Sequence, residues 1–121
     1  MSNNVAFITG ISGQDGGHLA ELLLSKNYIV HGMTRRNSDF DTSRFTEDEN
    51  NRIFLHYGDM SDGSRLGNLI SKIRPDEVYN LACTPDVMVS FQCPEYTCEI
   101  AGLGTVKLLE ACKNLDKPVR Y

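Results

Sequence analysis

Three glycines that recur at every third position are the first residues in this chain whose spacing suggests chemistry. Gly10, Gly13 and Gly16 follow a short apolar run that ends at Thr9. In a strand–turn–helix unit, the first glycine permits a tight turn, the second lets a pyrophosphate approach the backbone, and the third lets the helix pack closely. The helix then offers its N-terminal N–H groups to the phosphates. The spacing predicts a dinucleotide site, and the alternative is a structural turn without a ligand.

Two arginines stand beyond the end of the second apolar run, where nicotinamide dinucleotides are usually told apart. An acidic residue there hydrogen-bonds the ribose 2′-hydroxyl of NAD, whereas arginine receives the 2′-phosphate of NADP. Arg35 and Arg36 occupy this position, about 20 residues after Gly16 as the motif expects, and the first acid is Asp39. A charge-assisted hydrogen bond of about 1.5–3 kcal/mol would favour NADP roughly 10- to 150-fold. The alternative is an exposed basic pair at a loop edge.

The ends of two further apolar runs supply candidate contacts to the rest of the cofactor. Asp59 follows the third run, where the adenine would lie, and its carboxylate could accept the adenine amino group with Met60 against the ring. Asp59 could equally be only a turn residue. Leu81 and Ala82 end the fourth run and would line the cofactor with apolar surface, although core packing is the equal alternative for Leu81.

Strands and helices must alternate to position these residues. Short apolar runs predict buried strands at residues 5–9, 28–33, 52–57 and 77–82, and a fifth begins at residue 118, shortly before the sequence stops. Helical patterns lie between them. Such a series predicts an α/β fold, namely a doubly wound, Rossmann-like parallel sheet of strand order 3-2-1-4-5 with helices on both faces, incomplete at strand 5. We expect a single NADP-binding domain over residues 1–121, without a substrate domain.

Local signals define the expected helix ends. Asn27 can take the left-handed position after the first helix, and Asp62 can cap a helix that Pro75 stops. A short helical piece is expected near residues 42–47. Pro94 is expected to open a long helix. Its expected apolar face comprises Tyr96, Ile100, Leu103, Val106, Leu109 and Cys112.

Composition excludes several classes of protein. A net charge of −4 gives no general attraction to nucleic acid, and no apolar run approaches the ~20 residues of a membrane helix. The four cysteines form no Cys-x-x-Cys pair, so their spacing predicts no metal site and favours free thiols in the cytoplasm. His18, His31 and His56 are expected to be structural or exposed rather than a ligand set.

Several longer motifs follow one another along the chain. They are the loop at residues 9–21 with its Gly-Gln-Asp-Gly core, His-Gly-Met-Thr-Arg-Arg-Asn-Ser at 31–38, His-Tyr-Gly-Asp-Met at 56–60, Glu-Val-Tyr-Asn-Leu-Ala at 77–82, and Glu-Tyr-Thr at 95–97 followed by Gly-Leu-Gly-Thr at 102–105. In this order they resemble the GDP-mannose 4,6-dehydratase family of extended short-chain dehydrogenase/reductases. The resemblance implies that Ser12, Gln14 and Asp15 join the glycines in holding the cofactor. It also implies that Arg35, Arg36, Asn37 and Ser38 bind the 2′-phosphate.

The resemblance implies an NADP-dependent lyase of nucleotide-sugar metabolism that converts GDP-mannose into GDP-4-keto-6-deoxymannose by internal hydride transfer. It also implies a homo-oligomer, with GDP-mannose bound only when a C-terminal half is present. No tyrosine here has a lysine four residues later, and residues 83–86 depart from the family's Ala-Gln-Ser-His-like segment. We therefore expect no catalytic residue and no activity from the 121 residues alone. A stand-alone dinucleotide-binding or regulatory module, or a remnant without a ligand, is the alternative.

Overall fold

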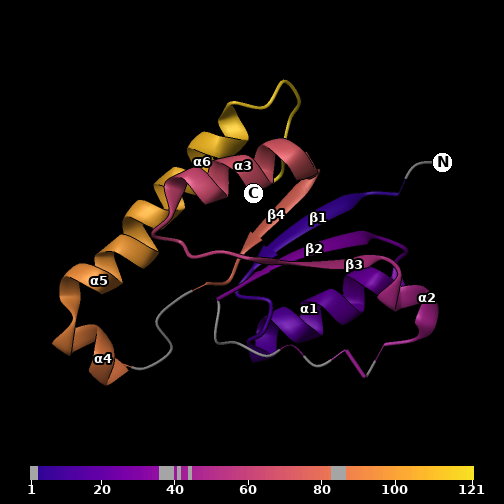
Figure 1. Ribbon diagram of the computed structural model, residues 1–121, viewed down its shortest axis with the longest axis horizontal. Coiled ribbons are helices and arrows are strands. Elements are labelled where there is room, and N and C mark those ends of the chain that lie inside the picture. Colours follow the sequence, from indigo (N-terminus) through magenta and orange to yellow (C-terminus); the bar gives the residue numbers. More distant parts are fainter. Residues whose placement is uncertain (1–2, 36–39, 41, 44, 83–86) are drawn as a thin grey trace.

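A four-stranded parallel sheet forms the centre of the computed structural model, which describes residues 3–35, 40, 42–43, 45–82 and 87–121 (Figure 1). Its strands are β1 (Val5–Thr9), β2 (Ile29–Thr34), β3 (Ile53–Tyr57) and β4 (Glu77–Asn80). They lie in the order β3-β2-β1-β4, and all three neighbouring pairs are parallel. The predicted Rossmann-like α/β fold and the order of its first four strands are therefore confirmed.

The start of the fifth strand lies beside β4, as the predicted order requires. Arg120 forms an isolated parallel bridge with Glu77. Its N–H donates to the carbonyl of Asp76 at 2.9 Å, and its carbonyl accepts from the N–H of Val78 at 2.8 Å.

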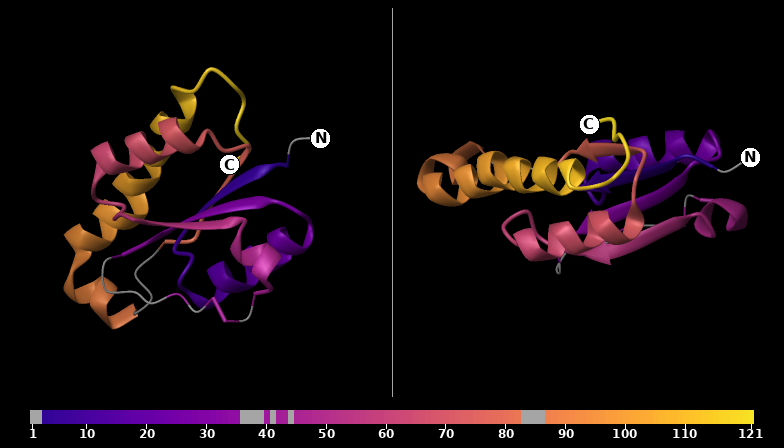
Figure 2. Two further views of the ribbon diagram at one scale, coloured as in Figure 1. Left: turned by 45° about the vertical axis from the view of Figure 1, so that its right-hand side comes forward. Right: turned by 90° about the horizontal axis from the view of Figure 1, so that it is seen from above.

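Helices cover both faces of the sheet, as the views in Figures 1 and 2 show. On one face lie α1 (Gln14–Ser25) and the short α2 (Glu47–Asn50), and on the other lie α3 (Gly63–Ile73) and α6 (Gly104–Lys113). Successive residues of β1 point to opposite faces, so Phe7 joins one buried cluster while Ala6 and Ile8 join the second. These two clusters are the cores on either side of the sheet.

The expected helix ends are largely confirmed. Asn27, just after α1, has φ 65°, and its N–H donates to the carbonyl of Leu24. The side chain of Asp62 accepts from the N–H of Arg65 at 3.1 Å and so caps α3. That helix ends at Arg74, φ 51°, directly before Pro75. The short helix α2 lies later than expected because Thr46 and Glu49 form a capping box that begins it at Glu47.

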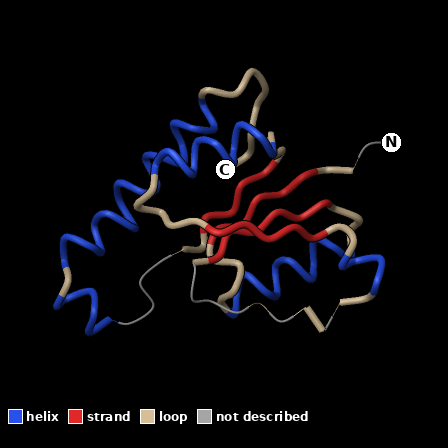
Figure 3. Tube along the Cα trace, in the orientation of Figure 1, coloured by secondary structure: helices blue, strands red, loops and turns tan. Residues whose placement is uncertain are grey.

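From Pro94 onward, the chain differs from the one long regular helix that the sequence predicts. It forms α5 (Pro94–Cys98), a π-helical turn η1 (Glu99–Leu103) and then α6, and the short α4 (Val87–Gln92) precedes them. Pro94 does open α5, as expected. Figure 3 shows α4 and α5 as an arm that extends away from the strands.

The expected apolar face of this segment is partly wrong. Ile100 is buried as predicted, but Leu103, Val106 and Leu109 are 58%, 54% and 42% exposed. The buried residues are instead spaced at four: Ile100, Gly104 and Leu108. A π turn accommodates one extra residue, and each residue turns a helix by about 100°, so the inward face changes along the segment.

Candidate dinucleotide-binding site

The carboxyl ends of all four strands meet at one edge of the sheet. In the strand register, Thr9 of β1 pairs with Met33 of β2 and with Asn80 of β4, while Thr34 pairs with Tyr57 of β3. The chain leaves β1 toward β2 on one side, and β4 joins β1 on the other, so the crossovers diverge at β1. In doubly wound sheets, ligands bind in the crevice outside such a point.

The glycine turn makes close contact with the end of β4. Gly10 has φ +68°, a left-handed conformation that side chains disfavour. A Cβ placed there would lie 2.8 Å from the carbonyl carbon and oxygen of Leu81 and 2.9 Å from the nitrogen of Ala82. At Gly16, a Cβ would collide with the carbonyl oxygen of Gly10 and lie 2.7 Å from Cα of Ile11. The first and third glycines are therefore required by close backbone packing.

Gly13 differs because a Cβ there would meet its nearest neighbour only at an ordinary contact distance. The nearest atom to a Cβ placed there is the carbonyl oxygen of Gly10 at 3.4 Å. Gly13 is also the N-cap of α1, and as a glycine it has no side chain to accept a hydrogen bond from the first turn of the helix. Gln14 and Asp15 form the exposed first turn, and Ser12 is half-buried just before it. This end of α1 can accept an anion, because its N–H groups and the helix dipole favour negative charge.

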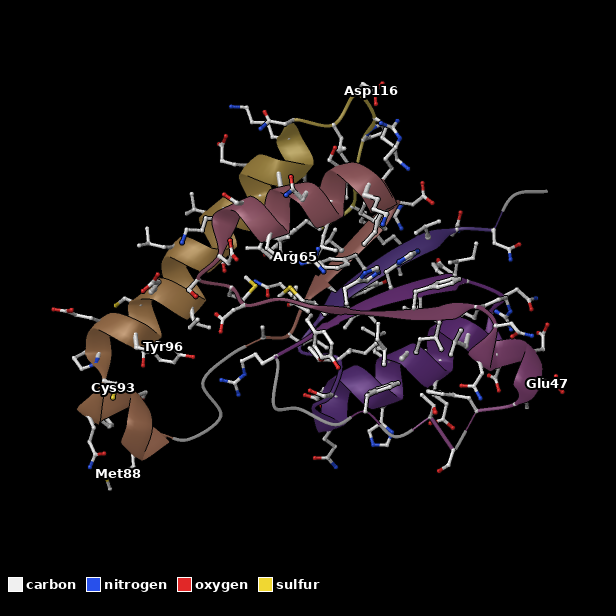
Figure 4. The ribbon with its side chains drawn as sticks, in the orientation of Figure 1. Glu47, Arg65, Met88, Cys93, Tyr96 and Asp116 are labelled. Atoms are coloured by element: carbon white, nitrogen blue, oxygen red, sulfur yellow. The ribbon has the colours of Figure 1, made fainter. Side chains whose placement is uncertain are left out.

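Arg35 lies at the end of β2 and is exposed. Its Nη1 donates to the hydroxyl of Tyr96 at 3.5 Å, so the guanidinium approaches the projecting helix α5, where Figure 4 labels Tyr96. No pattern in the sequence indicates this tyrosine contact. Arg36, Asn37 and Ser38, the other residues expected at the 2′-phosphate, lie outside the described residues, as do residues 83–86.

Asp59 and Met60 are both engaged within the protein. One carboxylate oxygen of Asp59 accepts from the N–H and from the hydroxyl of Ser61, each at 2.9 Å, which supports the alternative that Asp59 shapes the turn. The side chain of Met60 is 2% exposed and packs against Gly104, which leaves it little surface for an adenine ring. Of the other two candidates, Leu81 is 37% exposed and Ala82 is half-buried against the core.

Thr9 is a residue of this site that sequence reasoning did not single out. Its side chain is fully buried, and its hydroxyl oxygen accepts from the N–H groups of Leu81 at 3.1 Å and Ala82 at 3.2 Å. It therefore fastens the end of β4 beside the glycine turn. A polar side chain at the end of a buried apolar strand was the available signal.

Away from the site, two histidines that the sequence treats separately meet on neighbouring strands. Nδ1 of His31 lies 2.9 Å from Nε2 of His56, and the His31 ring stacks with the ring of Phe54 and with that of His56. Burial, followed by the charges of His56 and Lys72, lowers the pKa of His31 to about 4. Burial, with Arg65 and Lys72, also lowers the pKa of His56. Among the described residues, no three His, Cys, Asp or Glu side chains gather as a metal site.

Two further findings concern the part of the chain that the structure describes. No helix there is both long and apolar enough to cross a lipid bilayer. Cys93, Cys98 and Cys112 are free, and Cys83 lies outside that part.

Comparison with known proteins agrees with this geometry. A GDP-mannose 4,6-dehydratase from Caenorhabditis elegans is 53% identical over 97% of this chain, and one from Yersinia enterocolitica is 51% identical over 96%. The chain spans about a third of the length of these relatives, 33% in each case. The crystal structure of UDP-glucose 4-epimerase from Thermus thermophilus, solved in complex with NAD, matches with a TM-score of 0.76. That match has 25% identity and covers 90% of this chain and 33% of the epimerase.

A family model described as GDP-mannose 4,6 dehydratase matches residues 7–121, nearly the whole sequence. The match includes the glycine turn, the β2 end with Arg35, and the β4 end that packs on Gly10. The chain belongs to the GDP-mannose 4,6-dehydratase family.

Proposed function

We propose that these residues form the NADP-binding part of a GDP-mannose 4,6-dehydratase. The observation that carries the proposal is the uncapped N-terminus of α1, which the glycine turn holds at the point where the crossovers diverge. An anion is the ligand that such a helix end favours. Gly13 leaves room for a pyrophosphate beside the backbone, whereas Gly10 and Gly16 have no such room and serve packing.

In this proposal the pyrophosphate, the adenine and the nicotinamide of the dinucleotide each lie at the end of a different strand. The backbone of residues 12–16, with the side chains of Ser12 and Gln14, binds the pyrophosphate, while Asp15 lies in the same helical turn. Asp59 and Met60 lie at the adenine, and the crowded surroundings of Met60 favour a contact through its backbone. Leu81 and Ala82 flank the path toward the nicotinamide. When bound, NADP would supply reversible hydride chemistry, and the described residues would bind and orient it.

Arg35 is proposed to select NADP over NAD. Arg35 is an exposed cation directly after β2, at the position where an NAD-binding chain would carry an acidic residue. A 2′-phosphate would therefore gain a charge-assisted hydrogen bond there. Arg36 and Asn37 are proposed to take part, on sequence grounds alone. The phenol of Tyr96 would help to hold the Arg35 side chain in place.

Calorimetric titration with NADP and NAD tests this proposal. The wild-type chain is expected to bind NADP more tightly than NAD, and Arg35→Ala is expected to weaken NADP roughly 10- to 150-fold while NAD changes little. Arg120→Ala is the matched control, because Arg120 is an exposed arginine, 85% accessible, beside the start of β4. A folded chain that binds neither dinucleotide would refute the proposal. Equal affinities that Arg35→Ala leaves unchanged would refute the role of Arg35.

The reaction proposed for the whole protein is dehydration of GDP-mannose to GDP-4-keto-6-deoxymannose. Family membership supports it. The 121 residues contain no Tyr-x-x-x-Lys motif, so we expect them to bind NADP without turning over the sugar nucleotide. Incubation with NADP and GDP-mannose, followed by chromatography, would contradict this expectation if the keto sugar formed.

Assembly and location are proposals as well. The exposed apolar side chains Leu103, Val106 and Leu109 support a homo-oligomer formed through the α6 region, which light scattering would test. A solution monomer of the whole protein at high concentration would overturn it. The free thiols support a reducing compartment, the cytoplasm.

A further inference from the structure

The side-chain amide of Asn80 lies where β1, β4, α6 and the end of the chain meet. Its Oδ1 accepts from the hydroxyl of Thr9 at 2.6 Å. Its Nδ2 donates to the hydroxyl oxygen of Thr105 at 3.2 Å and to that of Tyr121 at 2.9 Å. Thr9 and Asn80 are register partners on the α3 and α6 face, which places their side chains next to each other.

The hydrogen bonds around the Asn80 side chain are consistent with only one orientation of its amide group. The hydroxyl of Thr105 donates to the carbonyl of Ala101 at 2.6 Å, so its oxygen can only accept from Asn80. The NH₂ group of Asn80 must therefore face Thr105, and its carbonyl oxygen must face Thr9. A flipped amide would place a carbonyl oxygen against an oxygen that has no proton left to give.

The same reasoning continues to the glycine turn. The Thr9 hydroxyl oxygen accepts hydrogen bonds from the N–H groups of Leu81 and Ala82, and the hydroxyl donates its own proton to Oδ1 of Asn80. This orientation turns the lone pairs of the Thr9 oxygen toward the end of β4. Gly10, the next residue, packs against the same Leu81–Ala82 peptide with no space for a Cβ. The N–H of Leu81 also donates to the backbone carbonyl of Thr9 at 3.2 Å, so the Thr9 hydroxyl adds to that bond and is the acceptor for the N–H of Ala82.

We propose that Asn80 is a positioning residue for the dinucleotide crevice: its amide orients the Thr9 hydroxyl, which holds the glycine turn and the end of β4 together. Through Thr105, the same amide connects this arrangement to α6, two residues beyond the π turn. The inference rests on the proposed NADP binding. It assigns Asn80 no contact with the cofactor, and its effect passes through Thr9 to the pyrophosphate end of the crevice.

The test compares two substitutions at one position. Asn80→Leu removes the acceptor for the Thr9 proton, whereas Asn80→Asp keeps an oxygen there. The second oxygen of the aspartate faces Thr105, whose hydroxyl can turn its proton from the carbonyl of Ala101 to the charged carboxylate, the stronger acceptor. NADP binding is expected to weaken about tenfold in Asn80→Leu and less than about threefold in Asn80→Asp. Adenosine 2′-monophosphate has no pyrophosphate, so its affinity is expected to stay within about twofold in both variants.

A second readout needs no ligand. Amide hydrogen exchange at Ala82 is expected to be about tenfold faster in Asn80→Leu than in the wild type, because its N–H donates to the hydroxyl that Asn80 orients. Unchanged exchange and unchanged NADP affinity would overturn the inference. Equal losses for NADP and adenosine 2′-monophosphate would also overturn it, because they indicate general damage.

If Asn80→Leu does not fold, Thr105→Val tests the same chain of bonds from the other end. It removes the oxygen that fixes the amide, and we expect NADP to bind about threefold more weakly with faster exchange at Ala82. Wild-type values for both would overturn the inference. A wild-type chain that binds no NADP refutes the proposed function instead, and exchange at Ala82 then still decides the role of Asn80.

Discussion

Replacing Gly10 with alanine should destabilise the fold through contacts that can be counted atom by atom. The added Cβ would lie 2.8 Å from two backbone atoms of Leu81 and 2.9 Å from one of Ala82, so the end of β4 would have to move. Such overpacking costs about 1–3 kcal/mol. The left-handed conformation at φ +68° adds about 1–2 kcal/mol for a residue with a side chain. We expect Gly10→Ala to lose about 2–5 kcal/mol of unfolding free energy.

Gly67→Ala provides the matched control. Gly67 lies inside α3, and a Cβ placed there meets nothing within 4 Å. Alanine in a helix interior stabilises by about 0.5–1 kcal/mol relative to glycine. Both substitutions restrict the unfolded chain in the same way, so the difference between them reports the folded state.

Urea denaturation followed by circular dichroism measures the free energy of unfolding of both variants, and thermal denaturation measures their Tm. At roughly 4 °C for each kcal/mol, the Tm of Gly10→Ala should fall by roughly 8–20 °C, while that of Gly67→Ala should rise by roughly 2–4 °C. A Gly10→Ala variant as stable as the wild type would refute the reasoning, because it would mean that the turn and β4 do not touch as described.

Two further predictions concern buried polar groups. Thr9→Val should lose about 1–3 kcal/mol of unfolding free energy, because the N–H of Ala82 loses its acceptor. Thr9→Ser keeps the hydroxyl and should retain most of the wild-type stability. Equal losses for the two variants in denaturation experiments would contradict the role of the hydroxyl. Since the folded pKa of His31 is lowered to about 4, the unfolded chain binds more protons below pH 6.5, and its contribution to stability is complete above that pH and falls toward pH 4. The free energy of unfolding at pH 5 should therefore be about 1–2 kcal/mol lower than at pH 7.5. His31→Gln should make this dependence less steep, and a dependence as steep as in the wild type would contradict the role of His31.

Some residues of the site could be predicted from the local sequence, and others could not because their contacts join distant parts of the chain. The sequence is sufficient to place Gly10, Gly13 and Gly16 in a turn between a strand and a helix, because the backbone of such a turn requires glycine at this spacing. Arg35 could be placed at a strand end by the same argument. Tyr96 could not be connected with Arg35, because they are distant in sequence and meet only when α5 projects past the end of the sheet.

The helix ends were determined locally, and the strand order was predicted from a combination of patterns. Apolar runs alternating with helical patterns predict a parallel sheet with right-handed crossovers, and the glycine motif after the first run favours the Rossmann order, whose first four strands the structure confirms as β3-β2-β1-β4. Asp62 and Asn27 act on backbone groups a few residues away, which makes their roles readable from the sequence.

Tertiary structure alone decided which face of the last helices is buried and how the polar groups pair. A regular 3.6-residue period predicts that Leu103 and Val106 face inward, but the π turn changes the face, and Gly104 then packs on Met60. Likewise, the register of β2 against β3 brings His31 to His56. These contacts depend on atoms far apart in the chain, and no local period in the sequence encodes them.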